Sequence, residues 1–116
     1  MVVKDLDFGE LRPANLVRCH DAYHPLDEWS LCDWATAAAG EMGEVCGVVK
    51  KLRRISSDDD AALDAFPDQL VPLSDEIADV VIYLDLLAAR AGIDLGSAVR
   101  RKFNATSDKV GSTVRL

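Results

Sequence analysis

The feature that most constrains the fold is one long helical stretch that begins at Ser30. Asp33 follows three residues later, a spacing that resembles a capping box, in which the two residues satisfy backbone amides at a helix start. The helix is expected to run to about Arg54, because cations that suit the helix dipole crowd its last turns: Lys50, Lys51, Arg53 and Arg54. No stretch alternates apolar and polar residues as a strand does. The chain is therefore predicted to be all-α.

Three further helices are predicted around this one. A short first helix spans residues 9–20, a third runs from about Ser74 to Ala91, and Asp94 caps a fourth that ends near Gly111. Residues 55–72 form an acidic connection that contains prolines, and its unusual length predicts that it is mobile or functional. We expect one domain over residues 1–116, with four main helices in a bundle and an antiparallel pair, the second and third helices, at its centre.

Charge and composition exclude several classes of protein. The net charge of −7 argues against a nucleic-acid or anionic-membrane binder, because neither partner attracts an acidic surface. The three cysteines are an odd number without a CxxC pair, which favours reduced thiols over a disulfide framework or a zinc site. Since neither a signal peptide nor a membrane-length apolar run is present, we expect a soluble, cytoplasmic protein.

Two pairs of acidic residues interrupt the apolar faces of the two central helices. Projection at about 100° per residue places Glu41 within the apolar stripe of its helix and Glu44 at the border of that stripe. Glu76 and Asp79 repeat the arrangement on the third helix, again three residues apart. Most such pairs, taken alone, are solvated surface charges. Here the apolar surroundings predict that all four carboxylates face another group.

Buried carboxylates need a cationic partner, because burying an uncompensated charge costs several kcal/mol. Within the third helix the only cation is Arg90, and the second helix keeps its cations at one end. Hard divalent cations bind carboxylate oxygens, and Mg²⁺ in particular leaves coordination positions for water and phosphate. A Mg²⁺ site between the two helices is therefore the favoured interpretation, with Mn²⁺ as a substitute.

Three stretches resemble a known family. In order, "GEMGEVCGVVKKL", "LSDEIADVVIYLDLLA" and "VRRKFNATSDKVG" resemble successive helices of the MazG-like all-α nucleoside triphosphate pyrophosphohydrolases, which include dCTP pyrophosphatases. The resemblance covers about residues 26–111 and implies metal-binding roles for Glu41, Glu44, Glu76 and Asp79. Many members carry a further Glu where this chain has Gly40, so the number of metal ions and the carboxylate that activates water stay open.

The reaction that the resemblance implies is hydrolysis between the α- and β-phosphates of a nucleoside triphosphate, as part of nucleotide-pool house-cleaning. Either Glu41 or Glu44 would act as the base that activates water. A non-catalytic helical module that senses nucleotide or metal is the main alternative. A structural dimerisation bundle with buried ion pairs is a third interpretation, and it predicts no stabilisation by Mg²⁺.

Five residues outside the acidic pairs are candidates for substrate binding. Lys51 is positioned to reach phosphate, although a solvated lysine that compensates the helix dipole explains it equally well. Tyr83, Lys102 and Asn104 match positions that bind nucleotide in the resembled family, against the alternatives of a core tyrosine and ordinary surface residues. Trp29 could stack on a base, or it could be the hydrophobic staple of the following helix.

Self-association is expected from the third helix, which carries Ile82 and Leu86 on its outer side. A single small domain cannot cover apolar surface all around a helix, so we expect a homodimer or homotetramer. The resemblance adds the expectation that Lys102 serves the metal site of a neighbouring subunit.

Overall fold

The structure is a computed structural model that describes residues 3–116, and all the regular secondary structure of these residues is helical, with no β-strand. The chain divides into two compact units. One contains residues 29–84, and the other contains the residues up to Glu28 together with Asp85–Leu116. The described residues form five α-helices and three short helical turns, in the order α1 (Phe8–Arg18), a π-helical turn (Cys19–Tyr23), a 3-10 turn (Leu26–Glu28), α2 (Leu31–Ile55), α3 (Asp59–Ala65), a 3-10 turn (Pro67–Gln69), α4 (Leu70–Arg90) and α5 (Leu95–Val110).

The start of α2 confirms the predicted capping box. The Ser30 hydroxyl oxygen accepts a hydrogen bond from the Asp33 amide at 3.1 Å, and the Asp33 carboxylate accepts one from the Ser30 amide at 2.9 Å. Hydrogen bonds from the Ser30 backbone and hydroxyl hold the pKa of Asp33 below its ordinary value. The helix then continues to Ile55, within one residue of the predicted end.

The connection over residues 55–72 contains more structure than its composition predicted. Asp58 accepts a hydrogen bond from the Ala61 amide at 3.1 Å and so caps α3, which the sequence analysis did not identify as a helix. The following helix, α4, begins at Leu70 rather than at Ser74. Pro72 is compatible with this earlier start because it lies in the first turn, where a missing amide hydrogen breaks no helical bond.

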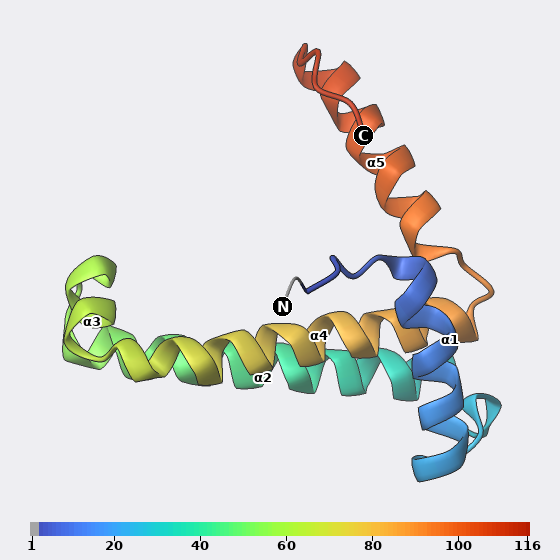
Figure 1. Cartoon of the computed structure of the whole chain (residues 1–116), viewed down its shortest axis with the longest axis horizontal. Helices are drawn as coiled ribbons and strands as arrows, with labels where there is room; N and C mark the ends of the chain where they lie inside the picture. Colours follow the sequence, from blue (N-terminus) through green and yellow to red (C-terminus); the bar gives the residue numbers. More distant parts are fainter. Residues whose placement is uncertain (1–2) are drawn as a thin grey trace. The chain divides into compact units, whose positions relative to one another are not determined.

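The pair formed by α2 and α4 (Figure 1) is antiparallel, as predicted. Trp34 contacts Tyr83, whereas Glu41, seven residues later on α2, lies close to Glu76, seven residues earlier on α4. The core of this unit is drawn mainly from α2 and consists of Trp34, Ala38, Val45, Val48 and Leu52, with Ala62 from α3.

The other unit is organised around the fully buried carboxylate of Asp85, near the end of α4. Arg12 donates from Nε to this carboxylate at 2.9 Å, and Asn15 donates from Nδ2 at 3.1 Å, so both bonds tie α1 to α4. Arg12 also donates to the Ile93 carbonyl oxygen at 2.8 Å. A buried ion pair of this kind is strongly destabilised when one partner is removed, because the remaining charge stays buried.

The limits of α5 confirm the sequence prediction. Asp94 accepts a hydrogen bond from the Ser97 amide at 2.8 Å, and the hydrogen bonds from Ser97 lower the pKa of Asp94. At the other end Gly111 adopts φ +74°, a left-handed conformation that glycine reaches without steric strain.

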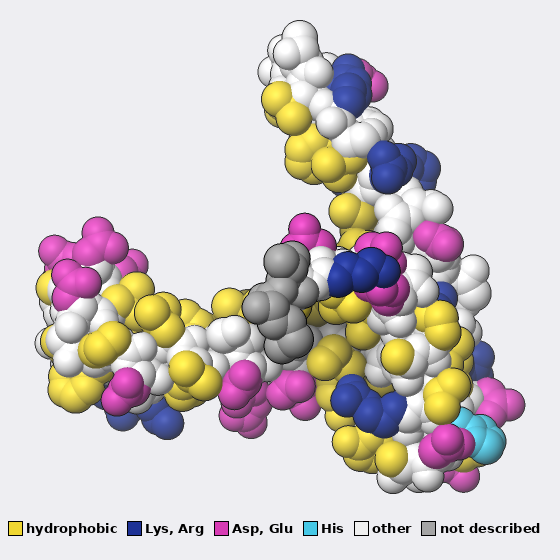
Figure 2. Space-filling view, in the orientation of Figure 1, with side chains coloured by type: hydrophobic (Ala, Val, Ile, Leu, Met, Phe, Trp, Pro, Cys, Tyr) yellow, Lys and Arg dark blue, Asp and Glu magenta, His cyan; other side chains and the backbone are white. Residues whose placement is uncertain are grey.

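The outer surface of α4 differs from its prediction. Leu86 is buried and Ile82 is half-buried, so neither forms an exposed apolar face as the sequence analysis expected. The exposed apolar residues of this helix are instead Ile77, Val81 and Leu84, together with residues at its start. Hydrophobic side chains reach the surface along α2, α4 and α5 (Figure 2). Within residues 3–116, no helix combines the length and the apolar character that crossing a membrane requires.

Candidate metal centre

Three of the four predicted metal ligands come together between α2 and α4. Glu41 contributes one carboxylate from α2, and Glu76 and Asp79 contribute two from α4. One oxygen of each lies within 4.8 Å of the others. All three side chains are half-buried. The i, i+3 spacing of Glu76 and Asp79 places them on the same side of α4, one turn apart, so that both face Glu41.

The carboxylate trio (Glu41, Glu76 and Asp79) brings like charges close together. Burial raises the pKa of Glu41, and the negative charges of Asp79, Glu76 and Glu44 raise it further. None of the ion pairs among the described residues includes a member of the trio. The like charges are therefore not neutralised by lysine or arginine in this part of the chain.

Glu44, the fourth predicted ligand, has a different environment. It is exposed, and among the described residues it is not part of the group that shares the 4.8 Å spacing. Its charge is nevertheless close enough to raise the pKa of Glu41, one turn earlier on α2. Glu44 is thus a carboxylate beside the trio rather than a member of it.

An aromatic cluster follows the trio along the same helix pair. Trp34 packs against Trp29 with ring centroids 4.6 Å apart, and against Tyr83 with centroids 6.3 Å apart. Trp34 is buried and belongs to the core, whereas Trp29 and Tyr83 are half-buried. Because Tyr83 comes four residues after Asp79, the cluster begins about 6 Å further along the axis of α4.

The contact between Trp29 and Trp34 bears on the two interpretations of Trp29. The Trp29 ring packs on a core residue at the start of α2, as expected for the hydrophobic staple of this helix. The partial exposure of Trp29 leaves part of its surface accessible to a ligand. The same holds for Tyr83, which packs on Trp34 and is also partly accessible.

The other candidate substrate residues lie apart from the trio in sequence. Lys51 is exposed near the end of α2, about 15 Å along the helix from Glu41. Lys102 is exposed on α5, in the second unit, where it borders a shallow hollow with Val99 and Phe103. No ion pair among the described residues joins Lys51 to an acidic residue of the site.

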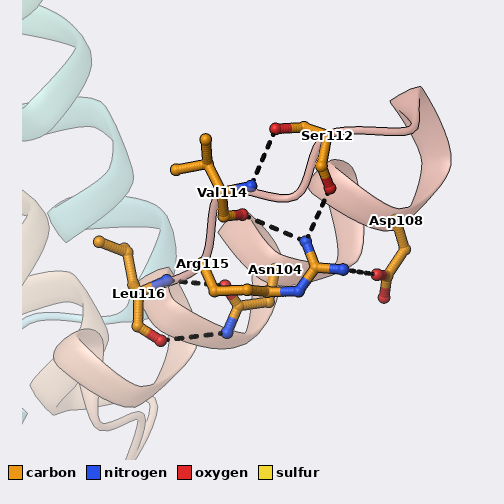
Figure 3. A network of polar contacts seen from close by, with 6 residues as sticks. All are labelled: Asn104, Asp108, Ser112, Val114, Arg115 and Leu116. Atoms are coloured by element: carbon orange, nitrogen blue, oxygen red, sulfur yellow. Dashed lines mark hydrogen bonds and ion pairs between the residues drawn. The ribbon is translucent and has the colours of Figure 1, made fainter.

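Asn104 has a structural role that the sequence did not indicate. Its Oδ1 accepts a hydrogen bond from the Leu116 amide at 3.0 Å, and its Nδ2 donates to the Leu116 carbonyl oxygen at 3.4 Å (Figure 3). Arg115 forms an ion pair with Asp108 and donates to the Ser112 carbonyl oxygen at 3.1 Å. Residues 112–116 therefore fold back along α5 and occupy the amide of Asn104.

Arg12, Asn15 and Asp85 form a polar network that the sequence did not predict. The network borders a cavity of about 300 Å³ at the starts of α1 and α5, which is also lined by Asp94. One signal was available, since Asp85 is flanked by leucines in "YLDLL" and a carboxylate in such a stretch needs a partner. The identity of the partner was not readable, because Arg12 precedes Asp85 by 73 residues.

Comparisons with family models, with curated proteins and with solved structures gave no match to this chain.

Proposed function

We propose that this chain is a Mg²⁺-dependent nucleotide pyrophosphohydrolase, which converts a nucleoside triphosphate and water into a nucleoside monophosphate and pyrophosphate. The observation that carries the proposal is the carboxylate trio, in which Glu41 meets two acids that follow it by 35 and 38 positions in the sequence, with no cationic partner among the described residues. The resemblance of the motifs around these residues to the MazG-like enzymes supplies the reaction. Its natural setting is the cytoplasmic nucleotide pool, where it would remove surplus or non-standard nucleotides.

The donor set of the trio fits Mg²⁺. Three carboxylates provide hard oxygen ligands within 4.8 Å of one another, and Mg²⁺ is commonly held by a few carboxylates while water and phosphate complete its coordination. When bound, the metal would neutralise phosphate charge and lower the pKa of a coordinated water. Glu41, Glu76 and Asp79 would hold it. Mn²⁺ fits the same donors and is expected to substitute.

Residues around the trio would supply the general base and the contacts to the nucleotide. Glu44, exposed and outside the trio, is the better of the two candidate bases, because a carboxylate that is not a metal ligand is free to accept the proton of the attacking water. The water oxygen bonds to the α-phosphorus as the bond to the bridging oxygen breaks, and pyrophosphate leaves. The exposed parts of Tyr83 and Trp29 are suited to contact the sugar and the base. Roles for Lys51, Lys102 and Asn104 rest on the resemblance alone, and Asn104 would have to release Leu116 to contact a nucleotide.

A direct assay tests the proposed reaction. Purified protein is incubated with each common (deoxy)nucleoside triphosphate and Mg²⁺, and pyrophosphate and orthophosphate are measured separately. We expect pyrophosphate release with at least one substrate, and loss of at least 100-fold in kcat for Glu76→Gln. Asp75→Asn serves as the control, because Asp75 is an exposed acid on α4 next to Glu76 but outside the trio.

The same experiment separates the enzyme from a sensor. A nucleotide- or metal-sensing module predicts that a nucleotide shifts the melting temperature while no phosphate product forms. Release of orthophosphate alone would contradict the proposed bond cleavage. A purely structural bundle predicts neither turnover nor stabilisation by Mg²⁺.

A further inference from the structure

We draw no further inference here: the strongest candidate, the cavity of about 300 Å³ at the starts of α1 and α5, carries nothing because its one cation, Arg12, is already paired with the buried Asp85, Asp94 already caps α5, and nothing in the structure shows what fills the cavity.

Discussion

Replacing Glu41 by Gln is expected to stabilise the metal-free protein while it abolishes turnover. The carboxylate oxygens of Glu41, Glu76 and Asp79 lie within 4.8 Å of one another. Two unit charges at that separation repel by about 0.9 kcal/mol even with the dielectric constant of water, so Glu41 takes part in about 1.7 kcal/mol of repulsion. Screening at physiological salt reduces this to about 1 kcal/mol. A chain of this length should then melt about 4 °C higher.

Mg²⁺ should reverse this order of stability. A cation that binds the folded trio stabilises the unmodified chain by mass action, and the variant has lost a ligand. Thermal unfolding of both proteins, with Mg²⁺ and with a chelator, measures the effect. Asp75→Asn is the control, because it removes an exposed acid next to the site. It should change the melting temperature by no more than about 1 °C, both with Mg²⁺ and with the chelator. In chelator, a melting temperature of Glu41→Gln at or below that of the unmodified chain would contradict repulsion within the trio. Equal stabilisation of both proteins by Mg²⁺ would contradict a metal site that includes Glu41.

The pH dependence follows from the raised pKa of Glu41. A carboxyl group whose pKa is higher in the folded state binds its proton more tightly there, so its contribution to stability is present below its ordinary value of 4.5 and is lost as pH rises through the folded value. Glu41→Gln resembles the protonated form. In chelator, the variant should therefore melt at a higher temperature than the unmodified chain at pH 7, and the two should melt at the same temperature at pH 4. A difference in melting temperature that grows toward pH 4 would contradict a raised pKa of Glu41.

Two other substitutions test the fold. Arg12→Ala should lower the free energy of unfolding by about 3 kcal/mol in urea titrations, because it leaves the buried Asp85 carboxylate without its cation. A loss below about 1 kcal/mol would show that the pair is not buried in solution. Gly40→Ala should raise the free energy of unfolding by up to about 1 kcal/mol, because Gly40 lies inside α2 and a Cβ there would meet no atom within 4 Å. Destabilisation would indicate that another chain approaches this position.

The sequence was most informative where short-range chemistry decides the structure. Three helix ends were predictable from capping residues: Ser30 and Asp33 at the start of α2, Asp94 at the start of α5, and Gly111 at its end. Each of these caps acts within four residues of its partner. The facing of Glu41 toward Glu76 and Asp79 was also predictable, because helical periodicity places each acid on the inner side of its helix.

The remaining features depend on contacts between residues far apart in the chain. Arg12 reaches Asp85 across 73 positions, and no local pattern identifies that partner. Glu44 lies at the border of its stripe, so a small rotation of the helix decides whether it joins the trio or faces solvent. Asn104 is engaged by Leu116 because the chain reverses after Gly111, a path that depends on the turn rather than on the motif around Asn104.

The most direct test of the central claim is the product of nucleoside triphosphate hydrolysis in the presence of Mg²⁺, with the unmodified chain and Glu76→Gln assayed side by side. We expect pyrophosphate and nucleoside monophosphate in equal amounts, dependent on Mg²⁺, and at least a 100-fold lower rate for the variant. Turnover that Glu76→Gln leaves unchanged, or the absence of pyrophosphate with every nucleoside triphosphate, would contradict it.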